Sequence, residues 1–303
     1  MKYFQFLITI FFLFWYGCNV QTSITNWTNI DYAGDDTVAH KLDIYLPEDN
    51  KSSYPGIIAI YGSAFMANNL KNHTYQVLGK PLLESGFAVI TINHRSTQED
   101  IYPAQINDIK AAIRFIRANG NQYRIDTSFI GITGISSGGH LAALAGTSGG
   151  IKEYTIDSMT LDIEGKIGDH TEYSSSVDAV VDWFGPTDFL IMDSCGSELV
   201  HDVPDSPESL LVGGSIQEKH EMCGLANPIT YIDNNDPPFL IFHGDNDLLV
   251  PYCQSKMLFE ALQKCEVPSE FILVPGAGHG SGLFEEKYFN MMTDFFLEVL
   301  NKN

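Results

Sequence analysis

Short apolar runs alternate with segments of helical periodicity along most of this chain. The runs that read as strands are residues 40–47, which alternate as an antiparallel strand does, and the buried runs 56–62, 86–93, 128–134, 175–185, 238–244 and 269–276. Helical spacing covers residues 103–119, 138–145, 254–263 and 284–300. This alternation predicts an α/β fold, with a mostly parallel central sheet and helices on both of its faces. In such sheets, ligands bind where loops leave the carboxyl ends of the strands.

No proline-rich or serine-rich linker divides the chain, so we expect one catalytic domain over residues 25–303. The chain has 303 residues, 44% of them hydrophobic, which is enough for one large core. The region from about residue 149 to residue 217 is polar, acidic and rich in loops around its one strand. We expect it to form a small cap or insertion over the site; the alternative is a surface excursion without a role in function.

The first 18 residues have the features of a secretory signal peptide. Lys2 is followed by an apolar run from Phe4 to Tyr16, which is shorter than a membrane-spanning helix. Cys18 ends this segment, where a bacterial lipoprotein signal would be cut and the cysteine lipidated. The alternative is a soluble exported protein cut a few residues later. We therefore expect a secreted or periplasmic protein, or a cell-surface lipoprotein anchored at Cys18, with no membrane span.

Four cysteines remain after the signal segment. Export permits disulfides, and Cys195 and Cys223 flank an irregular stretch that a bridge could close. Cys253 and Cys265 lie at opposite ends of one predicted helix, about 18 Å apart at 1.5 Å per residue, so we do not expect them to pair. None of the four has the C-x-x-C spacing of a zinc or redox site, and no metal is expected.

The charge of the chain limits its partners. The formal net charge of −21 argues against nucleic acid, anionic membranes and polyanionic substrates. A small-molecule or oligosaccharide substrate that is neutral or weakly charged fits better. The sequence does not specify an oligomeric state.

The stretch Gly134-Ile135-Ser136-Ser137-Gly138 has the pattern G-x-S-x-G. An apolar strand precedes it and a helical pattern follows, which is the context of a nucleophile elbow. Glycine is needed at positions 134 and 138 because helix and strand approach closely around a strained serine. The pattern therefore predicts that Ser136 is a nucleophile, against the alternative of an ordinary glycine-rich loop.

A nucleophilic serine requires a histidine base and an acid to orient it. His279 lies in a glycine-rich loop after the last apolar strand and before the last helix, where the third member of a Ser…Asp…His order belongs. Asp245 and Asp247 both follow the strand at residues 238–244. We favour Asp247, since a residue beyond the tight turn can reach the histidine loop, and keep Asp245 as the alternative. His243 lies inside the strand and is expected to be structural.

Attack on a carbonyl creates an oxyanion, which needs preorganised donors. One predicted donor is the backbone N–H of Ser137. The other is expected in the loop at residues 61–65, after an earlier strand, with Ser63 favoured and Ala64 next.

Together these segments resemble the α/β-hydrolase superfamily. They are most similar to exported carboxylesterases of the bifunctional acetyl-xylan and feruloyl esterase type, with dienelactone hydrolases and kynurenine formamidases as more distant relatives. The resemblance covers roughly residues 36–300. It rests on the ordered motifs IYGSAF, NHRSTQEDIYPAQINDIKAAIRFIRANG, GITGISSGGHLAALAGT, FGPTDF, ANPITYI, PPFLIFHGDNDLLVPYCQS and GAGHG.

The resemblance implies roles for individual residues. It implies that Ser136 is the nucleophile, Asp247 the acid and His279 the base, with Ser63 and Ser137 as oxyanion donors. One departure is the segment from Tyr61 to Phe65, Y-G-S-A-F, where many esterases have H-G-G-[GA]-W. It leaves the donor amides in place but changes the hydrogen bonding of the loop and the shape of the acyl pocket.

The family implies a serine ester hydrolase that acts on acetyl or feruloyl esters of plant cell-wall carbohydrate without metal or organic cofactor. Phe65 and Phe184 are candidates for an aromatic acyl pocket, and Arg95 and Asp108 for a buried ion pair. Two other functions stay open: an amidase of the arylformamidase type, and a non-catalytic module with a hydrolase fold. The signature of such a module would be a broken triad, and here all three positions are filled.

Overall fold

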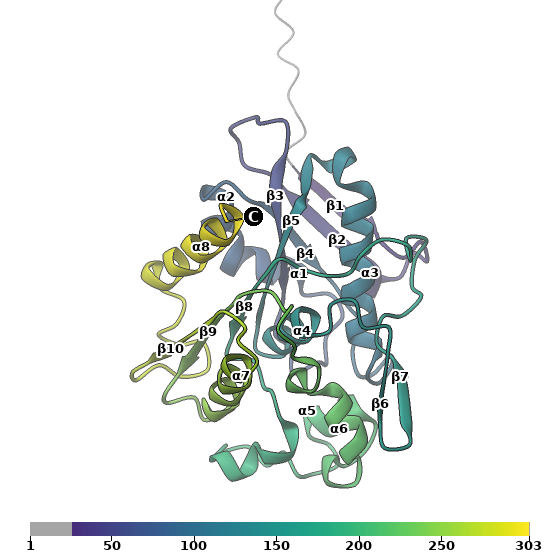
Figure 1. The fold of residues 1–303 in the computed structure, drawn as a ribbon, viewed down its shortest axis with the longest axis vertical. Coiled ribbons are helices and arrows are strands. Elements are labelled where there is room, and N and C mark those ends of the chain that lie inside the picture. The colour runs from purple at the N-terminus through teal and green to yellow at the C-terminus, as the bar shows by residue number, and fades with distance from the viewer. Residues whose placement is uncertain (1–25, 303) are drawn as a thin grey trace, which may run out of the picture.

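The computed structural model describes residues 26–302, so the expected signal peptide and Cys18 lie outside the described residues. Its main feature is an eight-stranded sheet with the strand order β1-β2-β4-β3-β5-β8-β9-β10 (Figure 1). The strands are β1 (Asn26–Asp31), β2 (Lys41–Tyr45), β3 (Tyr54–Ile60), β4 (Ala88–Ile92), β5 (Ile125–Ile135), β8 (Ala179–Trp183), β9 (Phe239–Gly244) and β10 (Ser269–Val274).

Strand directions confirm the predicted, mostly parallel sheet. In this eight-stranded sheet β2 pairs antiparallel with β1 on one side and with β4 on the other, and the other strand pairs of the sheet are parallel. The expectation of a buried strand was wrong for β10, in which Glu270 and Leu273 are exposed. This strand pairs only with β9, so the sheet ends there and the flanking helices cover it incompletely. The first strand, β1, was not predicted.

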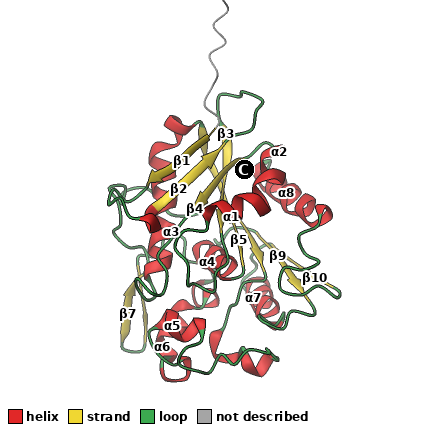
Figure 2. Cartoon of the chain, turned by 180° about the vertical axis from the view of Figure 1, so that it is seen from behind, coloured by secondary structure: helices red, strands yellow, loops and turns green. Residues whose placement is uncertain are grey.

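Helices cover both faces of the sheet (Figure 2). The α-helices of residues 26–302 are α1 (Lys71–Thr74), α2 (Lys80–Glu84), α3 (Ala104–Asn119), α4 (Ser137–Thr147), α5 (Pro207–Val212), α6 (His220–Ala226), α7 (Cys253–Lys264) and α8 (Glu286–Leu300). Successive strand residues point to opposite faces, and two apolar cores result. In β3, for example, Ile58 and Ile60 belong to the core that α3, α4 and α7 cover, whereas Ile57 belongs to the core under α2 and α8.

The region expected to form a cap contains one strand of the main sheet and two excursions from it. The hairpin of β6 (Glu153–Ile156) and β7 (Met159–Asp162) pairs only with itself, and β8 then enters the sheet between β5 and β9. After β8 the chain leaves the sheet until β9, and this second excursion carries α5 and α6, so it continues beyond residue 217. In Figure 1, β6, β7, α5 and α6 gather at the lower end of the molecule.

A predicted buried ion pair supports the loop after β4. The Arg95 guanidinium lies 2.7 Å from Oδ1 of Asp108, whose side chain is fully buried in α3. The backbone N–H of Arg95 also donates to this carboxylate. The pair fixes the start of α3 against the sheet, as expected for a structural contact.

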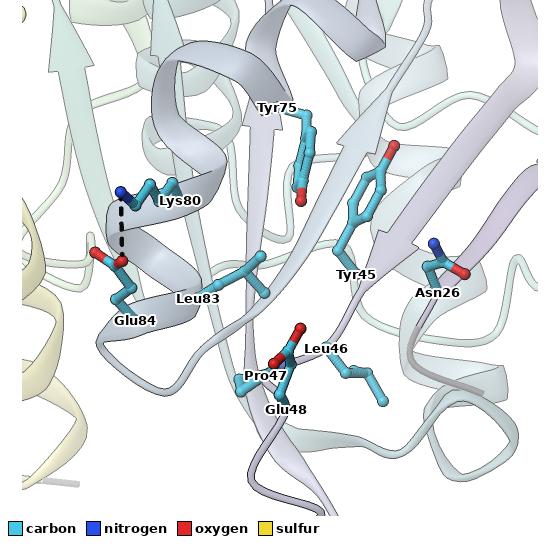
Figure 3. A pocket seen from close by; sticks show the side chains of 9 residues that line it. All are labelled: Asn26, Tyr45, Leu46, Pro47, Glu48, Tyr75, Lys80, Leu83 and Glu84. Atoms are coloured by element: carbon cyan, nitrogen blue, oxygen red, sulfur yellow. Dashed lines mark ion pairs between the residues drawn. The ribbon is translucent and has the colours of Figure 1, made fainter. Parts of the chain in front are cut away.

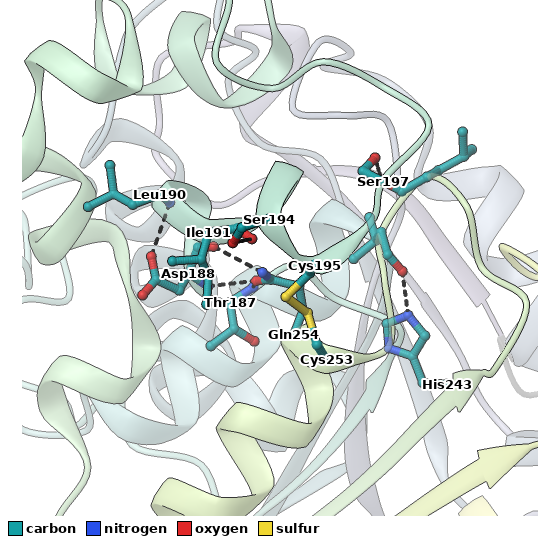
Figure 4. Close-up of a disulfide and its surroundings, with 12 residues drawn as sticks. Thr187, Asp188, Leu190, Ile191, Ser194, Cys195, Ser197, His243, Cys253 and Gln254 are labelled. Atoms are coloured by element: carbon teal, nitrogen blue, oxygen red, sulfur yellow. Dashed lines mark hydrogen bonds between the residues drawn. A yellow bond between two sulfur atoms is a disulfide. The ribbon is translucent and has the colours of Figure 1, made fainter.

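The disulfide is not the one between Cys195 and Cys223 that the sequence left possible. Cys195 pairs with Cys253, the first residue of α7, and not with Cys223 (Figure 4). Cys223 is a buried free thiol in α6, and Cys265 is also free. Closeness along the sequence does not decide which cysteines approach, and the segment of Cys195 folds back over the start of α7. As expected, Cys253 and Cys265 do not pair.

Candidate active site

Ser136 stands at a sharp turn between β5 and α4, as the nucleophile-elbow pattern predicts. Its backbone has φ 55° and ψ −122°, a conformation that side-chain-bearing residues rarely adopt. The turn is held because the Ser136 N–H donates to the carbonyl of Trp183, at 2.8 Å, and its carbonyl accepts from His140, at 3.0 Å. The strained turn therefore holds the half-buried hydroxyl of Ser136 at the carboxyl end of β5.

The glycines on either side of this serine have no room for a side chain. A Cβ atom on Gly134 would lie 2.0 Å from the carbonyl oxygen of Gly138, and one on Gly138 would lie 2.5 Å from the carbonyl oxygens of Ile60 and Tyr61. The close approach of strand and helix thus requires glycine at both positions.

The structure brings the three predicted triad residues together. Nε2 of His279 lies 2.9 Å from Oγ of Ser136, and Nδ1 of His279 lies 2.8 Å from Oδ2 of Asp247. An Nδ1–H that donates to the carboxylate leaves Nε2 free to accept from the serine hydroxyl. The Asp247 side chain is fully buried and that of His279 is 22% exposed, so the chain of hydrogen bonds runs from the interior to the surface.

Hydrogen bonds hold Asp247 as an anion. Burial acts to raise its pKa, but hydrogen bonds from His243 and His279, the charge of His279 and the N–H of Val250 together lower the pKa well below its usual range. Oδ1 accepts from the backbone N–H groups of Leu249 and Val250, each at 3.0 Å. The carboxylate is therefore fixed on both of its oxygen atoms.

The alternative acid, Asp245, is exposed and accepts a hydrogen bond from the backbone of Gly276. It does not contact the histidine. His243 is fully buried, with its ring nitrogens 2.7 Å from Oγ of Ser255 and from the carbonyl oxygen of Val250. This is the structural position expected for His243.

The two candidate oxyanion amides in the loop after β3 differ in their hydrogen bonding. The N–H of Ser63 donates to Oγ of Ser137, at 2.9 Å, so this amide is already engaged. Among residues 26–302, no acceptor is recorded for the N–H of Ala64, whose φ is 51°. The geometry therefore favours Ala64 over Ser63 as the partner of the Ser137 amide. The Ser137 hydroxyl, which the sequence did not single out, joins the two loops.

Tyr61 stands where many esterases have a histidine, and it stabilises the same loop. Its hydroxyl donates to the carbonyl of Ala67, at 3.0 Å, and its ring stacks on His94 with the ring centres 4.7 Å apart. Because the ring is buried and bonded at its tip, the loop keeps a fixed shape without the histidine.

Phe65 and Phe184 are both buried. Phe65 packs edge-on against His140 and Phe189. Phe184 packs against the ring of His279, with the ring centres 4.7 Å apart, and so contacts the candidate base directly. Their assignment to an acyl pocket remains a prediction.

A buried carboxyl group lies under the turn of Ser136. Asp182, on β8, accepts a hydrogen bond from the N–H of Gly185 through Oδ1, at 2.9 Å, and its Oδ2 has no hydrogen-bond partner among the described residues. Burial raises the pKa of Asp182 to about 7, against the lowering effect of the Gly185 hydrogen bond. The sequence analysis did not single it out, although a carboxylate in the apolar run VVDWFG was a visible signal.

A pocket of about 530 Å³ lies apart from this site, and Figure 3 shows the residues that line it. It is lined by the stacked rings of Tyr45 and Tyr75 and by Lys80 and Glu84, which form an ion pair. Tyr45 is paired in register with Val89, near the start of β4, so the pocket is not at the carboxyl ends of the parallel strands. It contains none of the triad residues.

Two further findings concern residues 26–302. No helix there has the length and apolar character required to cross a membrane. No group of three or more histidine, cysteine, aspartate or glutamate residues in this part of the chain could hold a metal ion.

The chain is similar to known proteins over most of its length. The family model BD-FAE matches residues 42–262. A solved structure described as a truncated form of a carbohydrate esterase from gut microbiota is 50% identical, with a TM-score of 0.88, and the match covers 91% of this chain and 96% of that one. A bifunctional GH43-CE protein of Bacteroides eggerthii is 52% identical with a TM-score of 0.88, over 91% of this chain and 35% of that one.

Among curated proteins, esterase LipC of Mycobacterium tuberculosis is 32% identical over 254 residues, which are 83% of this chain and 59% of LipC. The chain thus spans little more than half the length of such curated relatives. The family match covers most of the sheet, and the structural neighbours share its strand and helix arrangement. The chain therefore belongs to the BD-FAE family and has the α/β-hydrolase fold.

Proposed function

We propose that this protein is a serine carboxylic-ester hydrolase that removes acetyl or feruloyl groups from plant cell-wall carbohydrate. The observation that carries the proposal is the continuous chain of hydrogen bonds from Asp247 through His279 to Ser136, at a serine with strained backbone. Relatives at 50% and 52% identity are described as a carbohydrate esterase and a GH43-CE protein, which supports a carbohydrate ester as substrate. The net charge of −21 favours an uncharged one.

The reaction proceeds in two steps. Oγ of Ser136 attacks the ester carbonyl while Nε2 of His279 takes the hydroxyl proton, and the Asp247 carboxylate stabilises the imidazolium. The oxyanion of the tetrahedral intermediate accepts hydrogen bonds from the N–H groups of Ser137 and Ala64. The first of these lies at the start of α4, where the helix dipole favours negative charge.

Collapse of this intermediate breaks the bond to the alcohol, which leaves with the proton from His279. Water then attacks the acyl-enzyme, His279 takes a proton from it, and the acid is released as Ser136 regains its proton. Every proton transfer in this scheme passes through His279.

The cap and the export of the protein are part of the same proposal. The excursion after β8 lies against the loop of Asp247 through a hydrogen bond from Glu198 N–H to the Leu248 carbonyl, at 2.7 Å, which supports a cap next to the site. The Cys195–Cys253 disulfide supports export, since such bonds persist in oxidising compartments.

Hydrolysis of p-nitrophenyl acetate by the wild type and by Ser136→Ala tests the catalytic part. We expect kcat to fall at least about 10⁴-fold in this variant. Ser128→Ala, which removes an exposed hydroxyl on β5, is the matched control and should keep wild-type activity. Equal rates for wild type and Ser136→Ala would refute the proposal.

The substrate part needs natural esters. Release of acetate and of ferulate from acetylated and feruloylated xylo-oligosaccharides should be detectable, and dependent on Ser136. Cleavage of an aryl formamide at a higher kcat/KM than any ester would instead favour an amidase.

A further inference from the structure

Two peptide groups next to Asp247 are hydrogen-bonded on both sides. The N–H groups of Leu249 and Val250 donate to Oδ1 of Asp247, each at 3.0 Å. These N–H groups belong to the peptide units whose carbonyls are those of Leu248 and Leu249. Whatever binds these carbonyl oxygens therefore acts on the same rigid units that hold the carboxylate.

The carbonyl oxygens are bound by a segment of the excursion after β8, residues 193–208, which we call the strap. Oγ of Ser197 lies 3.0 Å from the carbonyl oxygen of Leu249 and 3.3 Å from that of Leu248. The N–H of Glu198 donates to the Leu248 carbonyl at 2.7 Å. Polarising a peptide carbonyl strengthens the donation by the N–H of the same unit.

A buried pair lies behind Ser197. Nε2 of His201 lies 2.9 Å from Oγ of Ser197, and Nδ1 of His201 lies 2.8 Å from Oε2 of Glu208. The side chains of His201 and Glu208 are 3% and 5% exposed. The strap is also bound covalently to the start of α7 through Cys195 and Cys253 (Figure 4).

The hydrogen bonds that link Glu208, His201, Ser197 and the Leu249 carbonyl restrict where the protons lie. The single hydroxyl proton of Ser197 can be donated to the Leu249 carbonyl only if Nε2 of His201 donates to the hydroxyl. His201 then carries both ring protons, as the carboxylate of Glu208 favours. Burial acts to lower the pKa of His201, but the hydrogen bond and charge of Glu208, with the charge of Asp193, raise it overall.

We propose that Ser197, oriented by His201 and Glu208, is a positioning residue that fixes the carboxylate of Asp247 through the Leu248–Leu249 and Leu249–Val250 peptide units. This inference rests on the proposed function, in which Asp247 orients the catalytic histidine. It assigns the strap a role in catalysis that does not require contact with substrate.

Three variants test the inference. Ser197→Ala removes the hydroxyl, Ser197→Thr keeps it, and Ser194→Ala is the control, because the exposed Ser194 hydroxyl in the same strap donates only to the Ile191 carbonyl. Each protein is assayed for kcat and KM on p-nitrophenyl acetate. The second readout is the downfield ¹H NMR signal of the His279 N–H that donates to Asp247, assigned by its loss in Asp247→Asn.

For Ser197→Ala we expect kcat to fall about 10-fold to 100-fold with KM unchanged, because a small shift of an orienting group weakens catalysis more than binding. The NMR signal should shift or broaden. Ser197→Thr should restore both readouts, and Ser194→Ala should leave both at wild-type values. Glu208→Gln is a second route to the same result if Ser197→Ala does not fold.

Wild-type kcat and an unchanged NMR signal in Ser197→Ala would overturn the inference, as would an equal loss in Ser194→Ala. If the wild type hydrolyses no ester, the proposed function fails, but the NMR signal still decides whether Ser197 positions Asp247.

Discussion

Nε2 of His279 lies 2.9 Å from Oγ of Ser136, although 143 residues separate them in the chain. The contact exists because the loops after β5 and β10 leave the same rim of the sheet, with the Asp247 loop after β9 beside them. Each link of this arrangement can be tested separately.

Asp247→Asn should lower kcat for p-nitrophenyl acetate by about 10⁴-fold while the protein stays folded. The amide preserves the shape of the side chain, but it no longer provides the negative charge that stabilises the imidazolium and holds its tautomer. Asp245→Asn, at an exposed position two residues earlier, should retain wild-type kcat. If the losses were the other way round, the acid would be Asp245.

The stability contributed by His201 should decline as pH rises. Its pKa in the folded protein is raised above 6.5 by Glu208 and Asp193, against the lowering effect of burial, so the folded state binds its proton more tightly than the unfolded state. The stabilisation is complete below pH 6.5 and is lost as pH passes through the raised pKa.

We therefore expect the difference in Tm between wild type and His201→Gln to be largest near pH 5 and to shrink towards pH 9. Differential scanning fluorimetry across this range measures it. A difference that grows with pH would contradict the protonated His201 in the strap.

Asp182→Asn should stabilise the protein at alkaline pH. Burial raises the pKa of Asp182 from 3.8 to about 7, so the cost of keeping this group in the folded state grows as pH rises from 3.8 to about 7 and reaches at most about 4 kcal/mol above that pH. The asparagine carries no charge and keeps an acceptor for Gly185. The difference in stability between the two proteins, measured by urea unfolding, should be smallest near about pH 3 and should grow in favour of the variant up to pH 8; a pH-independent difference would exclude this cause.

Loss of the disulfide should lower the free energy of unfolding by about 2–4 kcal/mol, because the bond closes a loop between residues 58 apart in sequence. Urea unfolding of Cys195→Ser/Cys253→Ser measures the effect. Dithiothreitol should bring the wild type to the stability of the double variant and leave the double variant unchanged. The free thiols of Cys223 and Cys265 are present in both proteins, so they cancel in the comparison.

Much of the fold could be predicted from local patterns. The helix expected at residues 103–119 is α3 (Ala104–Asn119), and each predicted strand lies within or overlaps an observed one. These elements are recognisable because their periodicity follows from which faces are buried. The meeting of Ser136, Asp247 and His279 was predictable for a related reason: each lies in the loop or turn after a strand of a parallel sheet, and such ends share one rim.

The strap was not predictable in this way. Ser197, His201 and Glu208 lie in an irregular segment without periodicity, and their contacts depend on the path that tertiary packing gives to that segment. The same reason explains why the sequence did not identify Cys253 as the disulfide partner of Cys195. The preference for Ala64 over Ser63 depends on a single hydrogen bond to the Ser137 hydroxyl, which no sequence pattern specifies.

The bonds between the strap and the carbonyl groups of Leu248 and Leu249 have a consequence for protein engineering. A chimera that took the region after β8 from another esterase would disturb the loop of the acid unless that loop were transplanted with it. A change made in this region to alter the substrate preference would therefore also lower turnover, unless the loop of Asp247 were redesigned with it.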